Sequence, residues 1–145
     1  MEHKIKIQLE RFNLLTSEID GAYHDAALRM ELSDSAMLIL YTVCSREGSC
    51  LLSDITSTSG VSKQTINSAL RKLEAEGIIY LEAFGARKKK VCFTDKGKQL
   101  ADHTVLRLIE IENQIFDSWS EKERQLYIEL TQRYLDMLKE KIKEL

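Results

Sequence analysis

Two long stretches, one at each end of the chain, carry apolar residues at the spacing of a helix face. The first predicts a helix over about 3–30, and the second predicts a helix that closes the segment 99–145. Proline is absent from all 145 residues, which permits long uninterrupted helices. The apolar positions are Ile5, Leu9, Phe12, Ile19, Tyr23, Ala26 and Met30 near the N-terminus, and Ile128, Leu135, Leu138, Ile142 and Leu145 near the C-terminus, with Tyr127, Leu130, Tyr134 and Met137 beside them.

These two apolar stripes are longer than the rest of so short a chain can cover. A symmetric homodimer, in which the ends of two copies cover each other, is the economical solution. We therefore expect a partner that is a second copy of the chain.

The middle of the chain predicts shorter elements. Ser33 or Asp34 can cap a second helix. The segment 51–79 predicts two short helices with Gly60 in a tight turn, Ser53 and Ser62 as their N-caps, and Val61 packing back. The β-prone segments "IIYLEAF" and "KKKVCFT" flank "GAR" and predict a hairpin. Thr94 can cap a further helix that runs to Trp119, and "SEKE" at 120–123 predicts the capping box of the last helix.

Composition excludes several classes of protein. The chain is 43% apolar and 30% charged, and it has no run of 18 apolar residues and no signal-peptide core, so we expect one domain over 1–145 that does not enter a membrane. Cys44, Cys50 and Cys92 lack paired spacing, which favours reduced thiols in a cytoplasm.

An enzymatic function is not expected. The three histidines lie far apart without metal-ligand spacing, and no glycine-rich phosphate loop or serine nucleophile motif occurs. We expect no catalytic residue, no metal site and no cofactor.

The segment 60–79 has an unusual polar face. Its apolar positions fit an ordinary amphipathic helix, but the opposite face has no carboxylate before Glu74. A helix that needs only solubility usually mixes Glu with Lys. Side chains of the types present can reach base edges, Gln and Asn at adenine and Arg at guanine. We therefore expect this face to enter the major groove of DNA.

Charge is concentrated around the same segment. Residues 61–98 hold nine basic and four acidic side chains, a net charge of +5. Because the whole chain is −2, the remainder carries −7. Such local clustering is what phosphate binding requires, although a merely solvated face would show it too.

The stretch "LSDITSTSGVSKQTINSALRKLEAEGIIYLEAFGARKKKVCFTDKGKQL" resembles the winged helix-turn-helix of MarR-type transcriptional regulators. "LSDSAMLILYTV" is similar to the second helix of that family, and "SWSEKERQLYIELTQRYLDML" to its final dimerisation helix. The resemblance implies a mainly α fold with a small β-hairpin wing, a winged lobe over about 32–98, and dimerisation helices over about 3–30 and 99–145. It also implies a homodimer that binds pseudo-palindromic double-stranded operators, usually as a repressor.

The resemblance assigns DNA-binding roles to two groups of residues. Those on the recognition helix are Lys63, Gln64, Thr65, Asn67, Ser68 and Arg71. Those on the wing are Arg87, Lys88, Lys89 and Lys90. The family wing often has an Asp that orients the Arg two residues later, but this chain has Gly85 there. We therefore expect the wing to act as a cluster of charges.

Two further readings concern partners. Family members bind small-molecule effectors between the dimerisation helices and the winged lobe, where Tyr23, Met30, Met37 and Tyr41 could line a pocket. For each of these residues taken singly, a place in the core is the simpler expectation.

The alternative function is a winged-helix module that binds proteins and has lost specific DNA binding.

Overall fold

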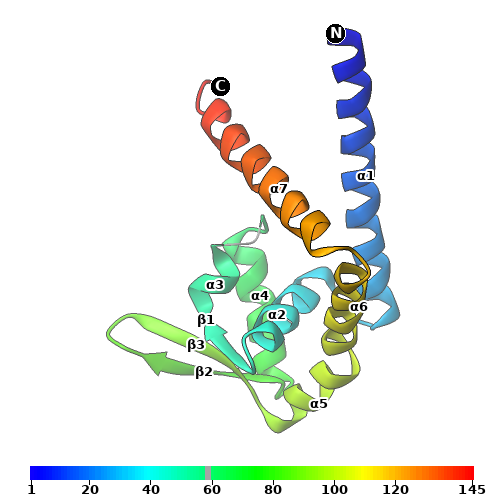
Figure 1. Ribbon diagram of the computed structural model, residues 1–145. Helices are drawn as coiled ribbons and strands as arrows, with labels where there is room; N and C mark the ends of the chain where they lie inside the picture. Colours follow the sequence, from blue (N-terminus) through cyan, green and yellow to red (C-terminus); the bar gives the residue numbers. More distant parts are fainter. Residues whose placement is uncertain (58–59) are drawn as a thin grey trace. The chain divides into compact units, whose positions relative to one another are not determined.

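The computed structural model describes residues 1–57 and 60–145, which form two compact units, Met1–Leu108 and Ile109–Leu145. The chain is mostly helical with one small sheet (Figure 1). Its elements are α1 (Glu2–Arg29), α2 (Asp34–Ser45), β1 (Ser49–Leu51), α3 (Leu52–Thr56), α4 (Lys63–Ala75), β2 (Ile79–Phe84), β3 (Lys88–Phe93), α5 (Asp95–His103), α6 (Val105–Asp117) and α7 (Glu121–Ile142).

Side-chain caps set the beginning of four helices, as the sequence predicts. Each hydroxyl accepts a hydrogen bond from a backbone N–H three residues on. At the start of α7 the Glu123 carboxylate also accepts a hydrogen bond from the Ser120 N–H, which completes a capping box. The capping residues are Ser33, Ser62, Thr94 and Ser120.

The start of α3 differs from the prediction. Ser53 is not its N-cap, because the helix begins at Leu52 and its N-cap is Leu51, two residues before Ser53. The Asp54 carboxylate accepts a hydrogen bond from the Leu51 N–H at 3.1 Å and satisfies this end instead. The predicted tight turn after α3 includes residues 58 and 59, which lie outside the described residues, and Val61 beyond it is exposed rather than packed back.

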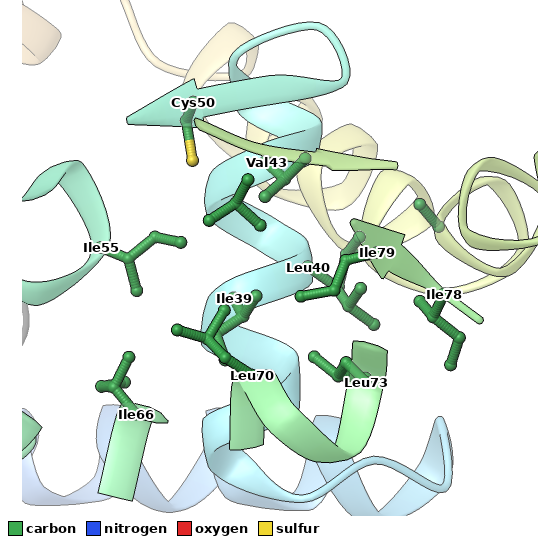
Figure 2. Close-up of a cluster of buried hydrophobic side chains, with 13 residues drawn as sticks. Ile39, Leu40, Val43, Cys50, Ile55, Ile66, Leu70, Leu73, Ile78 and Ile79 are labelled. Atoms are coloured by element: carbon green, nitrogen blue, oxygen red, sulfur yellow. The ribbon is translucent and has the colours of Figure 1, made fainter. Parts of the chain in front are cut away.

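The hydrophobic core of the first unit lies around α2. Ile39, Leu40 and Val43 are fully buried on this helix. Figure 2 shows side chains from α3, α4 and the sheet gathered around them. This core fixes one face of α4 through Ile66, Leu70 and Leu73 and leaves the opposite face to solvent.

The sheet has three antiparallel strands in the order β1-β3-β2. The predicted hairpin is confirmed, with Ile79 opposite Phe93 and Phe84 opposite Lys88. Strand β1 was not predicted, because its three residues are too few to show an alternating pattern. It pairs Cys50 with Val91 and closes the other side of β3.

A glycine allows α5 to pack closely on the base of the hairpin. A Cβ on Gly97 would lie 1.9 Å from the Ile78 carbonyl oxygen, so a larger residue does not fit. The Thr94 hydroxyl donates to the same carbonyl at 3.1 Å. The chain returning from β3 is therefore held against the end of α4.

The helix predicted from Thr94 to Trp119 is divided in two. Thr104 leaves helical geometry, with φ −127° and ψ −92°, and α6 begins at the next residue. The buried Thr104 hydroxyl donates a hydrogen bond to the Leu100 carbonyl oxygen at 2.7 Å. Such a side-chain bond to the backbone competes with continuation of the helix.

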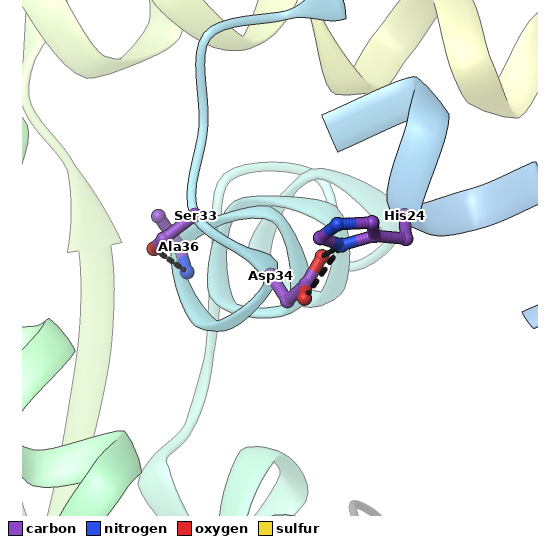
Figure 3. Close-up of polar contacts among 4 residues, drawn as sticks. All are labelled: His24, Ser33, Asp34 and Ala36. Atoms are coloured by element: carbon purple, nitrogen blue, oxygen red, sulfur yellow. Dashed lines mark hydrogen bonds and ion pairs between the residues drawn. The ribbon is translucent and has the colours of Figure 1, made fainter. Parts of the chain in front are cut away.

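A polar contact joins the end of α1 to the start of α2 (Figure 3). The His24 ring nitrogen Nδ1 lies 3.0 Å from both carboxylate oxygens of Asp34. Ser33, beside it, caps α2. His24 is exposed, as the sequence predicts, but it is paired with a neighbouring helix rather than only solvated.

The two terminal helices have almost no buried residues. Ala27 is the single buried position of α1, and α7 has none. Most of their large apolar side chains are about half exposed, such as Phe12 at 44% and Ile128 at 56%. No helix in the described part of the chain is both long and apolar enough to cross a membrane.

The second unit contains an ordered corner between α6 and α7. The Trp119 ring stacks on Phe116 at 5.1 Å between centroids and meets Tyr127 edge-on at 5.3 Å. The Arg124 guanidinium donates to the Phe116 and Trp119 carbonyl oxygens at 3.0 and 2.6 Å, which satisfies the end of α6.

Candidate nucleic-acid interface

Helix α4 presents a polar face to solvent. The buried Ile66, Leu70 and Leu73 fix its orientation. The exposed positions include all six residues predicted to contact DNA: Lys63, Gln64, Thr65, Asn67, Ser68 and Arg71. Because Glu74 is the first carboxylate of the helix, its first two turns carry no negative charge.

One of these side chains is already engaged. The Thr65 hydroxyl lies 2.9 Å from the Ser62 hydroxyl, which also caps the helix through the Thr65 N–H. Thr65 therefore supports the N-cap as well as facing solvent.

The wing is the hairpin of β2 and β3, joined by the three residues Gly85, Ala86 and Arg87. Gly85 has φ +73°, a left-handed conformation that glycine adopts without strain. Arg87, Lys88 and Lys89 are exposed, and no carboxylate in residues 1–57 and 60–145 forms an ion pair with Arg87.

Lys90 differs from its neighbours. It is half-buried, and its ammonium nitrogen lies 4.6 Å from the centroid of the Phe84 ring. A cation at this distance is attracted by the face of the ring.

A groove of about 410 Å³ lies between α3, α4 and the wing. Five of the ten predicted DNA-binding residues line it: Lys63, Asn67, Arg87, Lys88 and Lys89. The other lining residues are Leu51, Leu52, Ser53 and Thr56. The groove thus combines four cations with amide and hydroxyl groups, and none of the described residues that line it carries a carboxylate, which suits a phosphate-bearing ligand.

The remaining predicted residues lie elsewhere. Gln64, Thr65, Ser68 and Arg71 lie on exposed positions of α4 outside the groove lining, and Lys90 lies on the wing. Ser53 and Thr56 also line the groove but were not predicted to belong to the interface. Their spacing of three on a helix was the signal that they share a face.

Not every cation of the basic segment is available to a ligand. The Lys96 ammonium donates to the Glu76 carbonyl oxygen at 2.8 Å and so caps the end of α4. Lys96 therefore supports the fold rather than the interface.

The cysteines are poor candidates for a reactive site. Burial raises the pKa of Cys50 to about 11, and burial is also the largest cause of the raised pKa values of Cys44 and Cys92. Thiols become nucleophiles only as thiolates. Cys50 and Cys92 belong to adjacent strands, but alternation places them on opposite faces of the sheet, where they cannot pair.

Of the four residues predicted to line a ligand pocket, the structure places only Met30 in the lining of a cavity of about 290 Å³ and the other three elsewhere. The wall of this cavity also includes Leu32, Ala36, Ala69, Leu73 and Leu100. Met37 and Tyr41 pack against the hydrophobic core, and Tyr23 is exposed on α1.

Comparison with known proteins finds a family match over part of the chain. The MarR family model matches residues 31–89, which include α4 and the turn of the wing. No curated protein sequence matches the chain.

Solved structures with the same fold cover nearly all of the chain. The MarR family regulator NMB1585 from Neisseria meningitidis has a TM-score of 0.82 at 20% identity, over 94% of this chain and 97% of that one. A DNA complex of MepR from S. aureus has a TM-score of 0.64 at 18% identity, over 89% and 96%. The PcaV transcriptional regulator from Streptomyces coelicolor, in complex with its natural ligand, has a TM-score of 0.59 at 16% identity, over 84% and 89%.

The order of elements, the three-stranded wing sheet and the matched segment agree with one another. The fold predicted from the sequence is confirmed: the chain has the winged helix-turn-helix fold of the MarR family regulators to which it is similar, and residues 31–89 match the model of that family.

Proposed function

We propose that this chain is a transcriptional regulator that binds double-stranded DNA in a sequence-specific manner as a homodimer. The observation that carries the proposal is the groove between α3, α4 and the wing. Four cations line it, and its described lining residues include no carboxylate. The groove lies beside the first two turns of α4, which carry no carboxylate, so base edges and phosphates can be contacted together.

The two parts of the interface have different roles in this proposal. Arg71 and Gln64 read base edges from α4, since guanidinium and amide groups match the acceptors and donors of the major groove. Lys88 and Lys89 contact phosphates from the wing, which gives affinity but no sequence information. Arg87, which forms no ion pair among the described residues, acts as one more charge of that cluster.

The exposed terminal helices support the dimer. On α7 the apolar positions extend around roughly half of the circumference at 3.6 residues per turn. Exposed apolar surfaces of that extent are uncommon on monomers, and so wide an arc suits packing against more than one other helix.

Regulation follows by analogy with the similar proteins. A DNA complex of MepR and a complex of PcaV with its natural ligand share this fold. We propose that the chain acts as a repressor on a pseudo-palindromic operator, and that a small-molecule ligand bound near Met30 modulates DNA binding.

The salt dependence of duplex binding tests the phosphate contacts. Log K falls with log salt at a slope of about −0.9 per neutralised phosphate. Lys88→Ala with Lys89→Ala removes four cations per dimer, so the slope is expected to flatten by roughly 3 to 4 units. A matched control, Lys122→Ala with Lys139→Ala on α7, removes the same charge and is expected to leave the slope nearly unchanged.

Two results would contradict the proposal. Equal flattening in both double variants would show that only total charge matters. Failure of the wild-type chain to bind a long duplex at low salt would favour the alternative, a winged-helix module that binds proteins.

A further inference from the structure

The outer face of the hairpin carries opposite charges at opposing positions. Glu82 on β2 lies directly across from Lys90 on β3. Phe84 is two residues beyond Glu82, and strand alternation puts it on the same face. Opposite charges at such positions normally stabilise each other, so the register alone predicts a Glu82–Lys90 ion pair.

That ion pair is not formed. Among the ion pairs of the described residues none joins Glu82 to Lys90. The Lys90 ammonium lies over the Phe84 ring instead, and the Glu82 carboxylate accepts a hydrogen bond from the Cys92 thiol at 3.7 Å.

The choice of partner affects the charge that the wing presents. A carboxylate beside Lys90 would cancel its positive charge, whereas an aromatic ring attracts the ammonium without adding a net charge. Lys90 is outside the groove lining, but the residues next to it in the sheet line the groove: Lys89 precedes it on β3, and Leu51 is its partner on β1.

We propose that Phe84 is a positioning residue for DNA binding: its ring holds Lys90 away from Glu82, so that Lys90 joins the wing cations as a contact for a DNA phosphate. This inference rests on the proposed function. It also accounts for a phenylalanine that is 46% exposed beside the turn of the wing.

Phe84→Leu tests the inference, because leucine keeps an apolar side chain and removes the ring. In the free full-length protein, NMR should show that the Lys90 side-chain protons lose the upfield shift caused by the ring. On duplex DNA, the slope of log K against log salt should flatten by about 0.9 per protomer if Lys90 meets one phosphate. Phe84→Tyr keeps an aromatic ring, so it should keep both the upfield shift of the Lys90 protons and the wild-type slope.

A second background isolates the role of Glu82. Glu82→Gln removes the carboxylate opposite Lys90, so adding Phe84→Leu in this background should leave the slope unchanged. An equal flattening in both backgrounds would overturn the inference, as would a wild-type slope in Phe84→Leu alone. A wild-type chain that binds no duplex contradicts the proposed function as well, whereas binding with an unaltered slope in Phe84→Leu contradicts only the inference.

Discussion

The winged lobe and the terminal helices are similarly apolar in sequence but differ in how their apolar residues are covered. The cluster centred on α2 buries side chains from α2, α3, α4 and the sheet within one chain. On α7 no residue is buried, and on α1 only Ala27 is. Helical periodicity therefore identifies an apolar face but does not say what buries it. In the winged lobe the same chain buries the apolar faces, whereas on α1 and α7 they stay largely exposed in the single chain.

The largest effect is expected when charge is placed on the exposed apolar face of α7, which tests whether a second copy of the chain buries that face. Leu135→Asp with Leu138→Asp would put unpaired carboxylates into the proposed dimer interface, which is strongly unfavourable. Sedimentation at micromolar concentration is expected to give twice 16.7 kDa for the wild type and a monomeric or unfolded chain for the variant.

The control changes the polar side of the same helix. Gln132→Glu with Lys139→Gln alters the net charge by the same amount and is expected to keep the dimer. A well-folded wild-type monomer at this concentration would show that the exposed stripes are not a dimer interface.

A substitution in the winged lobe measures how much an apolar residue buried within one chain contributes to stability. Leu40 is fully buried on α2, so Leu40→Ala should lower the free energy of unfolding by about 2–5 kcal/mol through lost contacts and a cavity. Urea unfolding at fixed protein concentration measures this. Leu28→Ala, at a position that is 61% exposed, is the matched control, and an equal loss there would mean that exposure in one chain does not predict stability.

The smallest expected effect concerns the cap of α4. Ser62→Ala removes the side-chain acceptor for the Thr65 N–H and should lower the free energy of unfolding by about 1 kcal/mol. Ser62→Asp retains an acceptor and should recover most of it. Thermal unfolding of the three proteins gives the comparison, and equal stability of wild type and Ser62→Ala would show that the cap contributes little to the lobe.

Local rules predicted most of the elements. Ser33, Ser62, Thr94 and Ser120 were recognisable as caps because each hydroxyl precedes an apolar helical pattern. The hairpin was recognisable from two β-prone runs around Gly85. The features that local rules missed depend on tertiary contacts, such as the pairing of β1 with β3 and the bend at the buried Thr104.

The candidate interface was only partly predictable. The polar face of α4 follows from helical periodicity, since Ile66 and Leu70 point to the opposite side. The groove required the fold, because Ser53 and Lys89 are far apart in sequence and line it together. The partner of Lys90 was not predictable either, since the strand register favours Glu82 over Phe84.

The most direct test of the central claim is selection of bound sites from random duplex DNA, followed by Arg71→Ala. The account predicts an enriched pseudo-palindrome, with half-sites about one helical turn or a multiple of it apart, as expected for a two-fold dimer. Arg71→Ala should cost about 1–3 kcal/mol on that site and little on random DNA. No enriched sequence, or an equal loss on both DNAs, would contradict specific recognition by the exposed face of α4.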